Sequence, residues 1–313
     1  MKTHLSLTEL ATEIERRQHA KKDYVVNTKA MSMEEDTTLA LGGTGGTPEV
    51  LLPANDVAHQ QIASRLNIPH KYYDKMRREA PALLARNVNN WLHNEPEARL
   101  LRTLDGQARA FLSNRYQRIE NEQIAELVLP ILAEQPGMQI VSAAITETRM
   151  HIKAVFPKLE GEVAKGDVVQ AGIAISNSEV GHGAVKIEPL VYRLECLNGM
   201  ILPDQKYSAR HVGGANDIID GIYHILSDEA LQADDHAKLL KVRDVVRAST
   251  DAARFAANVA KMQEATGQLL EGDPSEAIKV LGKKIGLLEG EQGGILRRTL
   301  ATLAFMRPGQ VTL

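Results

Sequence analysis

The sequence has few of the residues on which several classes of protein depend. Its 313 residues include one cysteine, Cys196, which excludes an internal disulfide framework and a zinc site built from several cysteines. No apolar run approaches the roughly 18 to 20 residues that cross a bilayer, so no transmembrane helix is predicted. The N-terminal residues lack the continuous apolar segment of a signal peptide. We therefore expect a soluble cytoplasmic protein that has no membrane partner.

The chain also lacks an excess of charge of one sign. Its 37 lysines and arginines stand against 40 aspartates and glutamates, which gives a net charge of −3. This balance excludes a protein held on nucleic acid by bulk positive charge, but it allows a local basic groove, because binding depends on the charges near the phosphates. Aromatic residues make up only 4% of the chain, which leaves few rings for stacking on unpaired bases.

The two ends of the chain have the apolar spacing of helices, whereas the middle has that of strands. Helices are predicted at residues 5–19, 55–67, 69–76, 82–93, 121–134 and 234–270. Strands are predicted at residues 100–104, 108–113, 150–156, 168–176 and 184–197. The fold class is therefore α+β, with a curved, mainly antiparallel sheet over about residues 100–200 that is flanked by N- and C-terminal helices.

This order of elements divides the chain into four segments. They are an N-terminal helix and extended arm (1–54), a helical segment (55–98), a mixed sheet core (99–214) and a C-terminal helical region (215–313). The glycine tract at 42–46 lies in the arm, and it lacks the Gly-Lys-Ser/Thr ending of a phosphate-binding loop, so a plain loop is favoured.

The last predicted strand changes its pattern partway along. Val185 and Ile187 set one parity, whereas Leu190, Tyr192 and Cys196 set the other. A bulge or break at Glu188–Pro189 is expected, because proline removes a ladder donor. Cys196 is then expected to be buried on the apolar side and chemically quiet.

One helical segment resembles the start of a DNA-binding motif. Residues Ile62–Pro69 are similar to the first helix and turn of a helix-turn-helix, and His70–Arg78 would then be the recognition helix. Plain packing of two short helices gives the same pattern, so both interpretations stay open.

Three polar motifs stand where predicted strands end. After the strand that carries Arg109, Arg115 offers a planar donor fork for phosphate or carboxylate and Tyr116 an aromatic face; a structural turn is the alternative. In the loop of Asn177, Ser178, Glu179 and His182, an anion site competes with a plain hairpin connection. Arg193 is expected on the polar face of its strand. No metal, cofactor or catalytic motif is recognisable, so no catalytic residue, metal ligand or cofactor is predicted.

The longer motifs resemble a known family. IASRLNIPHKYYDKM, LLARNVNNWL, LLRTLDGQARAFLSNRYQRIEN and GIAISNSEVGHGAVKIEPLVYRLECLNGMI are similar to the phage- and plasmid-like proteins catalogued as domain of unknown function nine-three-two, over about residues 55–300. The resemblance implies residence on mobile elements and brings no activity. The family often continues with a further helical segment, so the role of a C-terminal portion stays open. Fold-level analogy implies kinship with single-strand annealing proteins of the Redβ kind, which oligomerise along DNA.

Three functions remain in view. The favoured hypothesis is a non-enzymatic, homo-oligomeric protein that binds single-stranded DNA in recombination or replication of a mobile element. Its basic groove would be lined by Arg102, Arg109, Arg115, Tyr116, Arg118, Lys186 and Arg193, with Tyr192 as a further stacking ring. One alternative is an enzyme that acts on nucleotides or nucleic acid, with Arg115, Asn177, Glu179 and His182 in one pocket. The other is a protein that binds a host factor or counters host defence through its helices.

Overall fold

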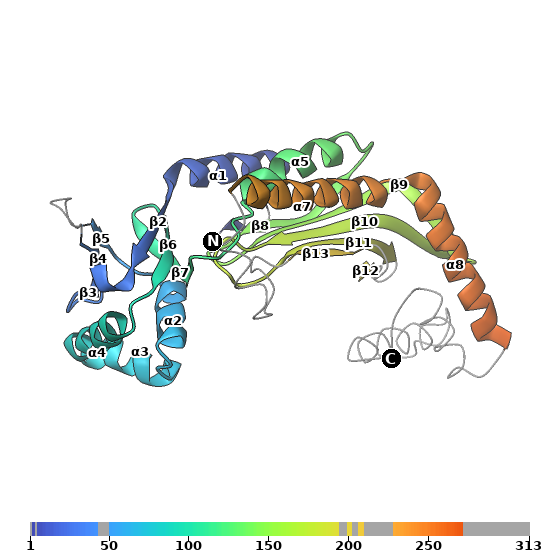
Figure 1. Cartoon of the computed structure of the whole chain (residues 1–313). Coiled ribbons are helices and arrows are strands. Elements are labelled where there is room, and N and C mark those ends of the chain that lie inside the picture. The colour runs from blue at the N-terminus through green and yellow to red at the C-terminus, as the bar shows by residue number, and fades with distance from the viewer. Residues whose placement is uncertain are drawn as a thin grey trace.

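The chain builds a long sheet layer with a smaller N-terminal lobe at one of its ends (Figure 1). The structure is a computed structural model that describes residues 2–3, 5–42, 50–193, 199–201, 206–209 and 228–271. Cys196 lies outside the described residues, so the prediction of a buried thiol there stays a prediction.

The sheet layer contains seven antiparallel strands, which we call the main sheet. Its order is β1-β8-β9-β10-β11-β12, and β13 also pairs with β11. These strands are β1 (Lys2–Thr3), β8 (Gln139–Ile145), β9 (Met150–Ala164), β10 (Asp167–Asn177), β11 (Val185–Arg193), β12 (Gly199–Ile201) and β13 (Tyr207–Ala209). Consecutive strands β8 to β11 pair as a meander, and the long strands β9 and β10 curve along their length (Figure 1).

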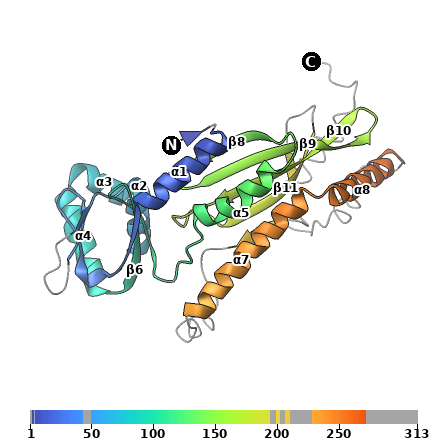
Figure 2. The same ribbon diagram turned by 90° about the horizontal axis from the view of Figure 1, so that it is seen from above.

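Helices cover one face of the main sheet (Figure 2). They are α1 (Leu7–Ala20), α5 (Asn121–Ala133), α7 (Asp228–Ser249) and α8 (Ala252–Glu271). Alternate strand residues such as Ile152, Ile173 and Ile187 point into a core shared with Leu10, Val128, Val242 and Val259 of these helices. Burial of these side chains stabilises the layer, since each large aliphatic side chain contributes about 1.5–3 kcal/mol.

The N-terminal lobe comprises residues 21–42 and 50–113. It contains the three-stranded sheets β2-β6-β7 and β3-β4-β5 together with α2, α3 and α4. Their bounds are β2 (Lys21–Asn27), a 3-10 turn (Thr28–Ala30), β3 (Met31–Met33), β4 (Leu39–Leu41), β5 (Val50–Leu52), α2 (Asp56–Arg65), α3 (His70–Glu79), α4 (Pro81–Asn94), β6 (Ala98–Leu104) and β7 (Gln107–Ser113). The lobe has its own apolar core, which includes Ile62, Tyr73, Leu84 and Phe111. The arm expected at residues 1–54 is thus joined to the predicted sheet core by the pairing of β2 with β6.

The fold confirms the predicted α+β class with its curved antiparallel sheet, but three local expectations differ. Strand β8 was not predicted, and β11 pairs with β10 without a register shift, so there is no bulge at Glu188–Pro189. The helix expected at 234–270 is two helices, because Asp251 interrupts it and caps α8 by accepting the amide N–H of Arg254 at 2.7 Å.

Candidate functional site

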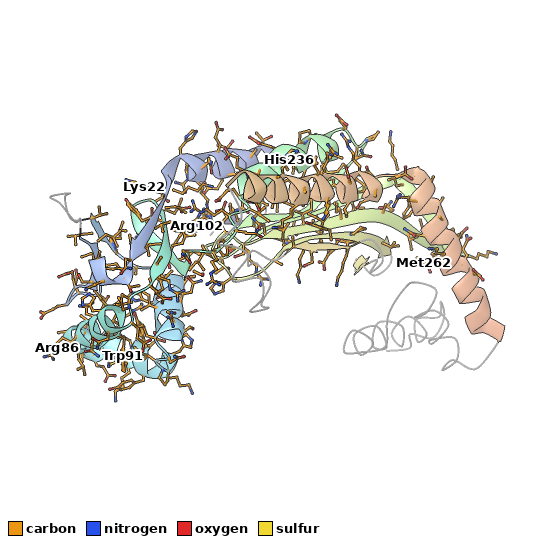
Figure 3. The ribbon with its side chains drawn as sticks, viewed as in Figure 1. Lys22, Arg86, Trp91, Arg102, His236 and Met262 are labelled. Atoms are coloured by element: carbon orange, nitrogen blue, oxygen red, sulfur yellow. The ribbon has the colours of Figure 1, made fainter. Side chains whose placement is uncertain are left out.

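Charged side chains meet in the interior where the N-terminal lobe joins the main sheet. Arg102, on β6, is only 1% exposed and lies at this junction (Figure 3). Its guanidinium donates to Asp23 at 3.0 Å, to Glu120 at 2.5 Å and to the carbonyl oxygen of Glu179 at 2.9 Å. Because every arm of the guanidinium has a protein partner, Arg102 ties β2, β6 and the β10–β11 loop together.

Arg109 has a single charged partner in the same cluster. Its Nη1 atom donates to Oε2 of Glu179 at 3.0 Å, and both side chains are about 95% buried. The other Glu179 oxygen accepts the backbone N–H of Asn121 at 2.9 Å, at the start of α5. Lys21 completes the cluster, with its ammonium 2.8 Å from Glu120 and 3.6 Å from Glu179.

The two carboxyl groups of this cluster have opposite pKa shifts. Burial, together with the neighbouring Glu179, raises the pKa of Glu120 above its ordinary value. Burial opposes ionisation of Glu179 as well, but the charge of Arg109, a hydrogen bond with Glu120, the charge of Lys21 and the Asn121 amide outweigh it and lower its pKa. Glu179 is therefore the firmly charged member of the pair.

The β10–β11 loop is fixed by the same region. Tyr116 is buried, its hydroxyl donates to the carbonyl oxygen of Ser178 at 2.8 Å, and it accepts the N–H of Gly181 at 3.3 Å. Asn177 is also buried and donates its amide to the carbonyl oxygen of Ile119 at 2.9 Å. The loop therefore has the structural role of a connection, with its polar groups facing inward.

These contacts correct part of the predicted site. Arg102 and Arg109 cannot line a groove in this fold, because both are buried against carboxylates, and the ring of Tyr116 is closed to a stacking base. The enzyme pocket is not assembled either, since Asn177 and Glu179 bond inside the junction while Arg115 is exposed in another loop. Within the described residues, no three His, Cys, Asp or Glu side chains come close enough to hold a metal ion.

The remaining predicted cations lie at the surface. Arg115 is exposed in the β7–α5 loop, and Arg118 is 45% exposed with Asp23 at 3.5 Å. His182 is half-buried in the β10–β11 loop, where its carbonyl oxygen accepts Nε of Arg149 at 2.9 Å. Arg149 comes from the β8–β9 turn, so this hydrogen bond joins two turns at the same end of the main sheet. The side chain of Arg193 lies outside the described residues.

The face of the main sheet opposite the four covering helices, which we call the open face, is polar at that same end. The register aligns Ala144, His151, Ser176 and Lys186 in one row across β8 to β11. The next row contains Ser142, Lys153, Ala174 and Glu188. We call these two rows the basic end: Lys186 is exposed, His151 and Lys153 are half-buried, and the other side chains are small except for Glu188.

The open face becomes apolar away from the basic end. Val155, Leu190 and Tyr192 form a separate buried cluster there. The Tyr192 ring lies against Gly172, where an added Cβ would come within 2.8 Å of it, and the Lys153 ammonium is 4.8 Å from the ring centre. Tyr192 is 4% exposed, so it does not offer a free ring to a base either.

Sequence reasoning did not select Lys153 or Arg149 as site residues. The signal for Lys153 was present, because the alternation in residues 149–156 separates it, with His151, from the apolar side. The sequence could not supply the register, which places Lys153 on β9 one row from Lys186 on β11, with β10 between the two strands.

Comparison with known proteins finds one family. The family model described as Domain of unknown function (DUF932) matches residues 109–281, which is more than half of the chain. The match begins in β7 and runs over most of the main sheet and its helices α5, α7 and α8. No curated protein and no solved structure matches the chain.

Proposed function

The chain belongs to the family described as Domain of unknown function (DUF932), a description that carries no activity, and we propose from its geometry that it binds single-stranded nucleic acid at the basic end of its open face. The observation that carries the proposal is that α1, α5, α7 and α8 cover one face of the main sheet, whereas none of the described helices covers the basic end of the other face (Figures 1 and 2). A flexible polyanion can lie along such a surface without entering a pocket.

The charges of the basic end support this proposal. No described carboxylate forms an ion pair with Lys153 or Lys186, unlike the arginines of the junction. Glu188 is the opposing charge on these rows, and it shares the row of Lys153 with Ala174 between them. Burial and the charge of Lys153 lower the pKa of His151, so His151 supplies hydrogen bonds rather than charge at neutral pH.

The size of the neighbouring side chains supports it as well. The side chains of Ala144, Ala174, Ser142 and Ser176 are small and project little from the sheet. Phosphates can therefore approach the lysine side chains and the serine hydroxyls. Arg115 and Arg149 add charge in the loops at the same end of the sheet. Phosphate contacts of this kind fix position without reading base identity, and we expect binding that tolerates sequence.

We also propose a biological role and an oligomeric state. The protein would act in replication or recombination of a mobile element, as the resemblance to phage- and plasmid-like proteins implies. It would do so as a homo-oligomer, which lets the basic ends of several copies follow one strand.

Fluorescence anisotropy with a labelled oligothymidylate, over about 50 to 200 mM salt, tests the proposal. Lys186→Ala and Arg115→Ala are each expected to weaken binding and to flatten the dependence of log affinity on log salt by about 0.7 per lost phosphate contact. Arg115→Lys should give an intermediate loss, because it keeps the charge and loses the planar fork.

Lys165→Ala is the matched control, because Lys165 is an exposed cation in the β9–β10 turn, at the other end of β9 and β10. It should leave the affinity and the salt slope unchanged. Wild-type protein without affinity for the oligonucleotide at low salt would overturn the proposal and favour the host-factor alternative. A variant that melts earlier while its salt slope stays the same would show a structural cation at that position.

A further inference from the structure

The first two helices of the N-terminal lobe, α2 and α3, are joined by a tight turn that backbone hydrogen bonds fix. Helix α2 ends at Arg65 with Leu66 as its C-cap, and Asn67 follows in the left-handed region with φ of 56°. The N–H of Ile68 donates to the carbonyl oxygen of Ala63 at 2.9 Å, and that of Asn67 to Ser64 at 3.3 Å. These two bonds form a Schellman motif, in which asparagine takes the place that glycine often has.

The side chains inside this helix pair keep the two helices in a fixed relation. Ile62 and Ala63 of α2 are fully buried, Ile68 in the turn is 9% exposed, and Tyr73 and Met76 of α3 are at most 3% exposed. The pair is also joined by a buried hydrogen bond of 2.9 Å between Nδ1 of His59 and the Tyr73 hydroxyl. Helix α3 leaves the turn in a clearly different direction from α2 (Figure 1).

The opposite side of α3 is exposed and carries charges of both signs, with three cations (Lys71, Lys75 and Arg78) against two anions. His70, Lys71, Tyr72, Lys75 and Arg78 are exposed, with Tyr72 at 51%. The acidic residues on the helix are Asp74 and Glu79, and Glu79 is 3.9 Å from Lys75. Arg77 lies nearer the core and pairs with Asp56 at the start of α2. The exposed cations therefore exceed the anions on the outer surface.

We infer that α2 and α3 form a helix-turn-helix that places α3 in the major groove of double-stranded DNA. In that motif two helices meet at a steep angle through a turn of three or four residues, and the second helix presents its outer side to base edges and phosphates. The 10 residues of α3 make a helix about 15 Å long, which suits a groove about 12 Å wide. Lys71, Lys75 and Arg78 supply the contacts, and Asp74 can accept from cytosine N4.

This duplex site is separate from the basic end of the open face. It lies on α3 in the N-terminal lobe, outside the residues that the family model matches, whereas Lys153 and Lys186 belong to the main sheet. Arg86 on α4 is a further exposed cation of the same lobe (Figure 3). A protein with both sites can hold a duplex and an unpaired strand at once.

Binding of the full-length chain to random-sequence duplex, followed by selection from a random duplex pool, tests the inference. The double variant Lys71→Ala/Lys75→Ala is expected to weaken duplex binding about tenfold or more and to reduce the salt slope by about 0.9 for each lost phosphate contact. Arg78→Ala is expected to relax preference at one position of the selected sequence. All three side chains are exposed, so the melting temperature should stay unchanged.

Two matched variants separate this inference from the proposed function. Lys165→Ala should leave duplex binding unchanged, and Lys186→Ala should weaken single-strand binding alone. The inference is overturned if wild-type protein does not bind duplex at low salt, or if Lys71→Ala/Lys75→Ala binds duplex as wild type does. Loss of single-strand binding in Lys186→Ala would still support the sheet surface in that case. Duplex binding that depends on α3, without single-strand affinity, supports α3 and ends the proposal for the sheet.

Discussion

Replacing Glu179 with glutamine is expected to lower the free energy of unfolding by about 3 to 5 kcal/mol, because it leaves a buried guanidinium without its counter-charge. Glutamine has nearly the same shape and can still accept the Asn121 N–H, which lies 2.9 Å from the carboxylate. It cannot supply the negative charge that Arg109 meets at 3.0 Å. Nε and Nη2 of Arg109 have no hydrogen-bond partner among the described residues, so nothing described here replaces Glu179.

Thermal and chemical unfolding followed by circular dichroism measures this loss. At roughly 2 to 4 °C per kcal/mol for a domain of this size, the melting temperature should fall by about 6 to 20 °C. Glu126→Gln is the matched control, because Glu126 is exposed on α5 and its replacement should change stability by less than about 0.5 kcal/mol. The two variants remove the same charge, but only Glu179 is buried and paired with cations.

A double variant separates the ion pair from packing. If the cost of Glu179→Gln arises from an unpaired Arg109, then Glu179→Gln/Arg109→Gln should be less destabilised than the sum of the two single variants, by about 0.5 to 3 kcal/mol. Additive losses would show that the two side chains act independently. A loss below about 1 kcal/mol in Glu179→Gln alone would refute the assignment of Arg109 and Glu179 as a buried structural pair.

Three further predictions concern stability. Burial lowers the pKa of His59 from its ordinary 6.5 to about 4. The contribution of the neutral ring to the free energy of unfolding is therefore complete above pH 6.5 and is lost as the pH falls through 4, by up to about 3 kcal/mol. Urea titrations at several pH values should show a weaker pH dependence in His59→Gln. Gly172→Ala should cost about 1 to 3 kcal/mol in the same assay, because its methyl group would lie 2.8 Å from the Tyr192 ring and from a backbone oxygen. Cys196→Ser should lower stability by roughly one to a few kcal/mol, and fast labelling of the native thiol would contradict a buried cysteine.

The regular elements were predictable because their patterns are local. In β9, Met150, Ile152, Ala154 and Phe156 alternate as a strand requires, and all four are buried on the helix-covered face. Strand β8, with the sequence QIVSAAI, was missed because a short run of small and apolar residues fits a helix or a strand. This segment forms a strand because it pairs with β9, and the local sequence does not show that pairing.

The two misread patterns have physical explanations in particular residues. The change of parity in β11 was attributed to a bulge, but the strand is regular and apolar residues stand on both of its faces, with Ile187 toward the helices and Leu190 toward the open face. The helix expected at 234–270 contains Asp251, whose side chain caps a new helix better than it continues an old one. The buried stripe accordingly moves to Phe255, Val259 and Met262, while Ala253 and Ala256 are exposed.

The division of the cations into structural and available groups required the fold. The sequence presents Arg102 and Lys186 alike, as single cations within strands. The carboxylates that neutralise Arg102 come from Asp23, 79 residues earlier, and from Glu120, 18 residues later, and no local pattern indicates either contact. Burial of an arginine is favourable only with such partners. A lysine that forms no ion pair with a described carboxylate can instead interact with an anionic ligand. The cations that we expect to contact phosphate are therefore those that no described carboxylate pairs. Lys186 on the open face and Lys71 on α3 are two of them.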